Sequence, residues 1–309
     1  MHYRTITDLN TAIISNLHKV PADIDVIVGI PRSGLLAANF LALHLHLPFT
    51  DVSGFLENRL LAGGERMKDF KSDIRQSSTV LVLDDSLNTG SSMEKVRNRL
   101  QTKHPDKNIL FSAVFMRPGN EHMVDFHFET CPVPRVFEWN LMNHPVIEDA
   151  CVDIDGVLCL DPAPGQNDDG ENYLEFVENA SPLLRIRRPI GCLVTNRLEK
   201  YRRQTEKWLK KHGIQYHELI MRDLPDKKAR LEAAEHGTFK GRIYKKRTDS
   251  KLFVESSYKQ SRDIARVSGK MVYCVDKRVM IQPNGLYAQK YYARRVLKKL
   301  KRMVVPLLF

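Results

Sequence analysis

Two pairs of aspartates have the residue type and spacing to do chemistry. Asp84 and Asp85 are adjacent and directly follow an apolar run of four residues. Asp153 and Asp155 follow a second apolar run and stand two positions apart, so their carboxylates share one face of an extended segment. Adjacent carboxylates can accept hydrogen bonds from the vicinal hydroxyls of a sugar. Carboxylates on one face suit a nucleophile with an acid/base partner, assisted by magnesium.

Small hydroxylated residues follow the first pair and lead into the sequence MEKVRNRL, which predicts a helix. Backbone N–H groups at a helix N-terminus, together with hydroxyls, can bind a phosphate. The combination predicts a sugar-phosphate site, with the phosphate in the loop, the ribose diol on Asp84 and Asp85, and a magnesium ion nearby. A plain capping loop with a solvated aspartate pair is the alternative. The loop consists of Asn88, Thr89, Gly90, Ser91 and Ser92.

Residues 80–92 resemble the phosphoribosyl diphosphate (PRPP) signature of type I phosphoribosyltransferases, which is a strand, two acids and Thr-Gly-x-Ser. In that family the two acids hold the 2- and 3-hydroxyls of the ribose. The loop that corresponds to residues 88–92 holds the 5-phosphate. The resemblance therefore implies PRPP as a substrate.

A second apolar strand, tight loop and helix begin at Val26, and their position matches the pyrophosphate loop of the same family. The match implies that Arg32, Ser33 and the amide of Gly34 face the diphosphate. A guanidinium fork suits paired phosphate oxygens, which agrees with an arginine at this place.

Residues 55–78 connect these two stretches and are polar. Their length predicts a lid that excludes water from reactive intermediates. Arg66 and Lys68 within it are candidate diphosphate contacts, although charged loop residues are more often simply solvated.

The elements that position these residues are predicted to be buried strands, each followed by a loop and a helix. Such apolar runs are typical of parallel strands in α/β proteins, whose ligands bind at the carboxyl ends of the strands. The 309 residues predict two domains of about 150 residues each. We expect two doubly wound parallel-sheet domains, 1–145 and 146–288, and a basic tail, 289–309. Pro145 marks the junction.

The sequence DACVDIDGVLCLDP, residues 149–162, closely resembles that of haloacid dehalogenase (HAD) phosphohydrolases. The resemblance implies a Rossmann-like second domain in which Asp153 attacks a phosphate and Asp155 transfers the proton. The later sequence IGCLVTNRLEK resembles the second motif, so Thr195 and Asn196 would hold the transferred phosphoryl group. About 40 residues separate Asp155 from Thr195, too few for a large inserted cap. A capless, open site admits a phosphate at the end of a bulky molecule.

The HAD resemblance also implies a magnesium ion and a lysine. Asp153, Asp155 and Glu255 are the expected metal ligands, and Glu255 stands where many members carry two acids. The basic segment 239–251 offers four lysines, of which we favour Lys245 or Lys246 because they lie ahead of the Glu255 strand. The four are Lys240, Lys245, Lys246 and Lys251.

Composition and charge indicate the compartment of the protein and its kinds of partner. The five cysteines include no Cys-x-x-Cys pair, which indicates neither zinc nor disulfides and favours a reducing cytoplasm. We recognise no signal peptide, and no apolar run approaches the roughly 20 residues that span a bilayer. Residues 290–302 hold seven basic residues and no acid, within a net charge of +11. This amphipathic stretch would either lie on an anionic membrane or pack on the protein. No nucleic-acid-binding module accompanies the charge.

Together the two resemblances imply a bifunctional enzyme, similar to ribofuranosyltransferase modules of bacterial polysaccharide (O-antigen or capsule) assembly. Such an enzyme would transfer 5-phosphoribosyl from PRPP to a glycan hydroxyl, release pyrophosphate, and then hydrolyse the 5-phosphate. The glycan would be linked to a lipid carrier, so the basic tail would contact the inner face of the membrane or other assembly enzymes. Two alternatives stay open: a nucleobase phosphoribosyltransferase fused to a nucleotidase, and a PRPP-sensing regulator without catalysis.

Overall fold

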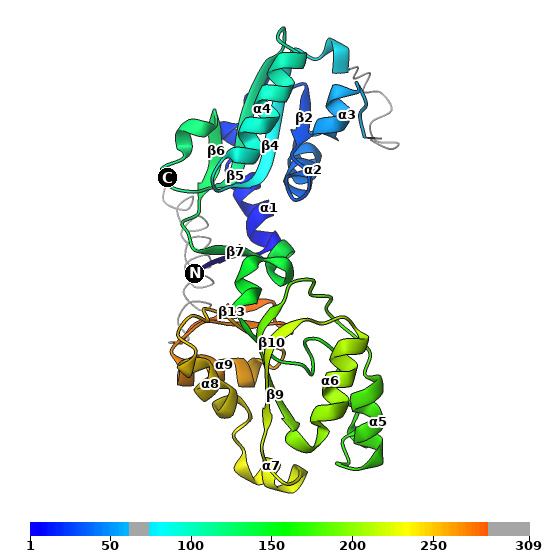
Figure 1. Ribbon diagram of the computed structural model, residues 1–309. Helices are drawn as coiled ribbons and strands as arrows, with labels where there is room; N and C mark the ends of the chain where they lie inside the picture. The colour runs from blue at the N-terminus through cyan, green and yellow to red at the C-terminus, as the bar shows by residue number, and fades with distance from the viewer. Residues whose placement is uncertain (62–73, 284–309) are drawn as a thin grey trace, which may run out of the picture. The chain divides into compact units, whose positions relative to one another are not determined.

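The structure is a computed structural model that describes residues 1–61 and 74–283. It forms two compact units, Met1–Trp139 and Asn140–Phe309, each with its own parallel β-sheet (Figure 1). The division falls inside a short 3-10 helix, Glu138–Asn143, whereas the sequence placed it after residue 145. Arg66, Lys68 and the predicted basic tail lie outside the described residues.

The first unit is built around a parallel sheet with the strand order β3-β2-β4-β5-β6. A separate parallel pair joins β1 (His2–Arg4) to β7 (Arg135–Phe137). The strands of the larger sheet are β2 (Val26–Gly29), β3 (Phe49–Asp51), β4 (Thr79–Leu87), β5 (Asn108–Met116) and β6 (Phe126–Thr130). The helices are α1 (Ile6–Ser15), α2 (Gly34–Leu45), α3 (Val52–Leu56) and α4 (Ser91–Lys103).

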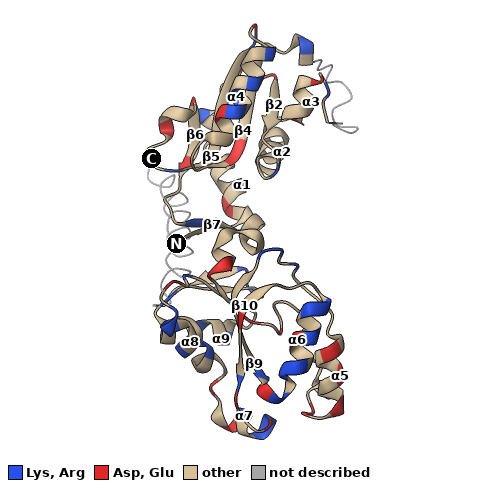
Figure 2. Ribbon diagram, in the orientation of Figure 1, with Lys and Arg blue, Asp and Glu red and all other residues tan. Residues whose placement is uncertain are grey.

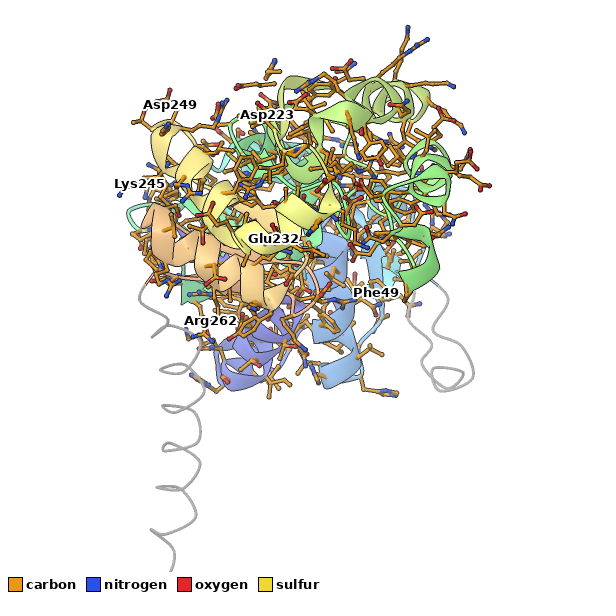
Figure 3. The ribbon with its side chains drawn as sticks, turned by 90° about the horizontal axis from the view of Figure 1, so that it is seen from below. Phe49, Asp223, Glu232, Lys245, Asp249 and Arg262 are labelled. Carbon is orange, nitrogen blue, oxygen red and sulfur yellow. The ribbon has the colours of Figure 1, made fainter. Side chains whose placement is uncertain are left out.

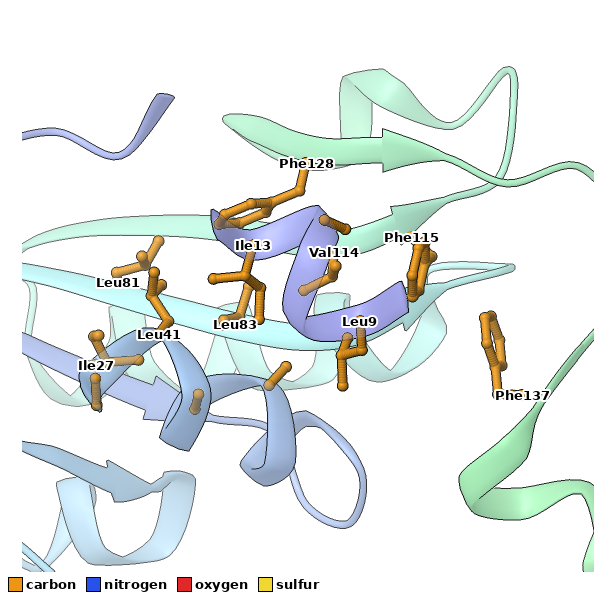
Figure 4. Close-up of a cluster of buried hydrophobic side chains, with 14 of the residues drawn as sticks. Leu9, Ile13, Ile27, Leu41, Leu81, Leu83, Val114, Phe115, Phe128 and Phe137 are labelled. Atoms are coloured by element: carbon orange, nitrogen blue, oxygen red, sulfur yellow. The ribbon is translucent and has the colours of Figure 1, made fainter. Parts of the chain in front are cut away.

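Central strand β4 is apolar because both of its faces are covered. Leu81 and Leu83 belong to one hydrophobic core, which α1 and α2 cover, and Figure 4 shows side chains of α1 packed over the sheet there. Val80 and Val82 belong to a second core on the opposite face, against α3 and α4. Side chains alternate between the faces of a strand, so an unbroken apolar run is required at this position.

The second unit contains a sheet with the order β10-β9-β8-β11-β12-β13, in which only the pairing of β12 with β13 is antiparallel. Its strands are β8 (Cys151–Val152), β9 (Ile190–Leu198), β10 (Tyr216–Arg222), β11 (Phe253–Glu255), β12 (Val272–Cys274) and β13 (Val279–Ile281). Its helices are α5 (Glu171–Asn179), α6 (Arg202–Lys211), α7 (Lys227–Ala233), α8 (His236–Lys246) and α9 (Tyr258–Ser268).

Helices cover this second sheet as well. Tyr244 of α8 and Ile264 of α9 pack against Cys151, Val194 and Phe253 of the sheet. Helices α5 and α6 lie on the other side of the sheet in Figure 1. The predicted α/β fold with parallel sheets is therefore confirmed.

Two general expectations can be compared with the described residues. None of their helices combines the length and the apolar character needed to cross a membrane. All five cysteines are buried and free. Figure 2 shows Lys and Arg gathered on α6, so the positive charge is not confined to the tail.

Candidate functional site

The first candidate site forms where β4 ends beside the loop between β2 and α2. The amide of Ile30 donates to the carbonyl of Leu83 at 3.0 Å, which ties that loop to the strand. A Cβ on Gly34 would lie only 2.9 Å from both Asp84 Oδ1 and the Leu83 carbonyl oxygen. Glycine is therefore what lets the loop with Arg32 and Ser33 approach the aspartate pair. Arg32 is exposed and Ser33 is half-buried.

The two aspartates differ in their surroundings. Asp85 is buried and accepts a hydrogen bond from Nε1 of Trp139 at 2.8 Å. Trp139 in turn stacks on Phe137, with 4.9 Å between the ring centroids. Asp84 accepts from the amide of Asp85 at 2.9 Å. Burial, followed by the charge of Asp85, raises the pKa of Asp84 well above its usual range.

The loop after β4 leads directly into α4. Gly90 has φ +83°, a conformation that side chains other than glycine rarely adopt, and it serves as the N-cap of α4. No side chain caps the first turn of this helix, so its N–H groups face the loop. Thr89 Oγ1 lies 3.2 Å from Ser91 Oγ. The structure also places Asn88 and Ser92 at the surface beside them.

The second candidate site forms at the carboxyl ends of β8 and β11. Lys240 of α8 is buried and donates to Asp153 Oδ2 at 2.6 Å and to Glu255 Oε2 at 2.7 Å. It also donates to Gln260 Oε1 at 3.1 Å, and Asn196 Nδ2 donates to the same oxygen at 3.3 Å. This network joins residues from two strands and two helices around Asp153.

Electrostatics in this cluster are set by two buried carboxylates around one ammonium. Burial raises the pKa of Asp153 well above its usual range, and the positive charge of Lys240 offsets this only in part. Burial alone would lower the pKa of Lys240, but Asp153 and Glu255 together raise it above its usual value. The ammonium therefore stays charged.

The choice of lysine is corrected by the structure. Lys240, rather than Lys245 or Lys246, lies beside Asp153. Lys245 and Lys246 are both exposed, and Figure 3 shows Lys245 at the outside of the second unit. Helical spacing explains the difference, because the buried face of α8 is formed by four residues at intervals of three or four. They are Gly237, Lys240, Gly241 and Tyr244.

Asp155 has a different environment from Asp153. It accepts from Nη2 of buried Arg197 at 2.7 Å and from Nε at 3.1 Å and 3.2 Å. The Cys159 thiol donates to it at 3.5 Å. Thr195 is buried two residues before Arg197 on β9, and its Oγ1 accepts from the Arg197 amide at 3.1 Å. The sequence analysis selected Thr195 and Asn196 but missed Arg197.

Magnesium fits these residues only together with a substrate. Within residues 1–61 and 74–283, no group of three or more His, Cys, Asp or Glu side chains could hold a metal ion by itself. Glu255 already accepts from Lys240 and, through Oε1, from the amide of Ser257. Magnesium commonly uses one or two carboxylates, several waters and substrate phosphates. The pairs Asp84 with Asp85 and Asp153 with Asp155 suit that pattern.

The raised pKa of Asp84 predicts a change of stability with pH. Because the folded-state pKa lies above the unfolded one, stability is full at acid pH and falls as the pH rises through the folded-state value. Asp84→Asn should remove this fall, so the variant should have a higher free energy of unfolding than the wild type at pH 7 and an equal one near pH 3. Urea unfolding across this pH range measures the difference. Exposed Asp106→Asn is the control, and an Asp84→Asn variant less stable than wild type at pH 7 would contradict the account.

Removal of the buried Lys240 ammonium should lower the stability of the folded chain. Lys240→Met leaves Asp153 and Glu255 without their cation, so we expect the free energy of unfolding to fall by about 3–5 kcal/mol. Lys245→Met is the matched control on the same helix and should change stability by no more than about 0.5 kcal/mol. Denaturant unfolding of both variants checks this, and similar losses in the two would show that the cluster is not held by Lys240.

Comparison with known proteins bears on the first unit. Residues 2–146 match the family model described as Phosphoribosyl transferase domain. Similar solved structures include a Helicobacter pylori xanthine-guanine-hypoxanthine phosphoribosyltransferase, with 20% identity over 45% of this chain and 92% of that chain (TM-score 0.34). A purine phosphoribosyltransferase from Pyrococcus horikoshii has 25% identity over 45% of this chain and 92% of that chain (TM-score 0.33). A search of curated proteins found no match. Residues 2–146 of the chain therefore form a phosphoribosyltransferase domain.

Proposed function

We propose that the chain is a two-site ribofuranosyltransferase. Its first unit would transfer 5-phosphoribosyl from PRPP to a hydroxyl of a glycan, and its second unit, a HAD-like phosphatase, would remove the 5-phosphate. The observation that carries the proposal is the buried Lys240–Asp153 ion pair beside Asp155, in a chain whose other unit is a phosphoribosyltransferase domain. A nucleophile, a fixed cation and a proton-transfer group are what hydrolysis of a phosphate ester requires.

In the transfer site, each part of PRPP has a proposed place. The 5-phosphate would bind the residues 88–92 loop at the start of α4, and the ribose hydroxyls would donate to Asp84 and Asp85. Arg32, Ser33 and the Gly34 amide would hold the diphosphate. The acceptor oxygen would then attack C1 as the bond from C1 to the diphosphate breaks, with inversion. The departing diphosphate would take the bonding electrons, and the proton of the acceptor hydroxyl would pass to it. Magnesium, when bound, would neutralise charge on that leaving group.

In the phosphatase site, Asp153 would attack the phosphorus of the 5-phosphate and form an aspartyl-phosphate. Asp155 would give its proton to the departing ribose oxygen and later take a proton from the attacking water. Lys240 would stabilise the charge on Asp153 and on the phosphoryl oxygens. Thr195 and Asn196 would hold the phosphoryl group.

The acceptor is the finer part of the proposal. A glycan acceptor would explain why the chain carries a phosphatase site, because hydrolysis of the 5-phosphate leaves a plain ribofuranosyl unit on the glycan. Polysaccharide units grow on lipid carriers, and a basic segment at 289–309 would suit the inner face of a membrane.

A nucleobase acceptor is the second candidate, and Trp139 favours it. Its indole lies within hydrogen-bond distance of Asp85, where a planar base could stack against an aromatic ring. Dephosphorylation of such a product would yield a nucleoside. A panel of glycans and nucleobases, with product mass as the readout, separates the two candidates.

Asp153→Asn tests the division of labour between the units. The variant should still transfer 5-phosphoribosyl but should hydrolyse the 5-phosphate at least about a thousandfold more slowly, because the amide is not a nucleophile. With PRPP, magnesium and an acceptor, mass spectrometry should show a phosphorylated product that the wild type converts to one lacking the phosphate.

Asp84→Asn is the matched control in the other unit. It should slow transfer and leave hydrolysis of added ribose 5-phosphate unchanged. If the folded Asp153→Asn variant loses both reactions, or loses neither, the proposed division of labour is wrong.

A further inference from the structure

Arg197 is a second fully buried cation near the second site, besides Lys240. Its side chain is 0% exposed, whereas that of Asp155 is 20% exposed. Two of its nitrogens, Nε and Nη2, donate to Asp155, and Nη1 lies 3.4 Å from Thr205 Oγ1. Nη2 also lies 3.3 Å from Cys159 Sγ. All three nitrogens of the guanidinium therefore have partners, and the group is fixed in one orientation.

This arrangement restricts Asp155 far more than a single hydrogen bond would. A planar guanidinium that approaches a carboxylate with two nitrogens fixes both the position and the plane of the carboxylate. Asp155 stays partly exposed, so it can still reach a water or a substrate from its open side. Asp153, by contrast, is held by Lys240 and receives no hydrogen bond from Arg197 among the contacts of the described residues.

We propose that Arg197 is a positioning residue that holds Asp155 as the proton acceptor for the second half of the phosphatase reaction. The inference rests on the proposed phosphatase function and extends it to a residue outside the motif positions selected from the sequence. In this role Arg197 acts only through Asp155, to which its Nε and Nη2 donate.

The step can be written in full. A water oxygen bonds to the phosphorus of the aspartyl-phosphate as the bond from phosphorus to the Asp153 oxygen breaks. The bonding electrons return to Asp153 as a carboxylate, inorganic phosphate leaves, and the water proton moves to Asp155. That proton is then available for the departing alcohol oxygen of the next substrate, so the cycle needs no further reactant.

Loss of the planar guanidinium fork, the contact that two nitrogens of Arg197 make with Asp155, should therefore slow hydrolysis of the aspartyl-phosphate more than its formation. With p-nitrophenyl phosphate the first half needs little help, because nitrophenolate leaves without a proton. The wild type should release nitrophenol at a steady rate. Arg197→Lys keeps the charge but lacks the planar fork, so it should release a burst of about one nitrophenol per active enzyme and then turn over about tenfold or more slowly. The phosphorylated protein should accumulate and be visible by mass spectrometry.

A purely structural role for Arg197 predicts a different result. Misfolding or loosening would lower both half-reactions together, without a burst and without phosphorylated protein, and that result would overturn the inference. The burst is counted per phosphorylated molecule, so a partly folded sample does not obscure it. Arg197→Gln provides a second variant that keeps a donor to Asp155 but has neither the fork nor the charge, and it should give the same burst.

Thr205→Val is the matched control. It removes the contact to Nη1 and leaves the Arg197–Asp155 pair in place, so it should show no burst and no phosphorylated protein. Failure of the proposed function would give a different result. A folded wild type that hydrolyses neither p-nitrophenyl phosphate nor ribose 5-phosphate would contradict the phosphatase assignment, and the inference with it. A wild type that turns over, alongside an Arg197→Lys variant that is slower but never phosphorylated, would overturn the inference alone.

Discussion

The burial of carboxylates at the ends of central strands is the constraint on which both units depend. A carboxylate taken out of water is unfavourable unless hydrogen bonds or cations compensate for the lost solvation. Asp85 and Asp153 are both nearly inaccessible, with 3% and 4% of their surface exposed. Each strand is apolar until it reaches its aspartates, so these positions can be kept only by partners that other elements supply.

The two units compensate for the lost solvation of their carboxylates in different ways. In the first, the compensation comes from neutral donors, namely the indole of Trp139 and a backbone amide, and the pKa of Asp84 stays raised. A polyhydroxylated substrate with a bound cation would relieve the repulsion between the two carboxylates that helps to raise this pKa. In the second, Lys240 and Arg197 each hold a carboxylate directly. Fixed cations of this kind suit a reaction in which negative charge moves between an aspartate and a phosphoryl group.

Local features of the sequence were enough to predict part of this arrangement. The apolar runs before Asp84 and Asp153 predicted parallel strands, and the glycine and hydroxyl residues after Asp85 predicted the loop that opens α4. The phosphoribosyltransferase resemblance of the first half agrees with the match to residues 2–146. These features depend on neighbours in sequence, which is why they can be recognised without a structure.

The partners of the carboxylates could not be predicted in the same way. Trp139 reaches Asp85 across 54 positions and Arg197 reaches Asp155 across 42, and such pairings depend on how the strands are ordered. Lys240 was within reach of sequence reasoning, because it shares a helical face with Gly237, Gly241 and Tyr244. Position ahead of the Glu255 strand favoured Lys245 and Lys246 instead. Arg197 gave a weaker signal, since it alternates onto the same face of β9 as Thr195.

The measurement that tests the central claim most directly follows one phosphorus atom. PRPP carrying isotopic phosphorus only in its 5-phosphate is incubated with the wild-type chain, magnesium and a glycan acceptor. The account predicts labelled inorganic phosphate in equal amount to the ribose gained by the acceptor, with none released when the acceptor is omitted. Label that stays on the ribosylated product, or that is released without any transfer, would contradict the claim that the two sites act in sequence on one ribosyl unit.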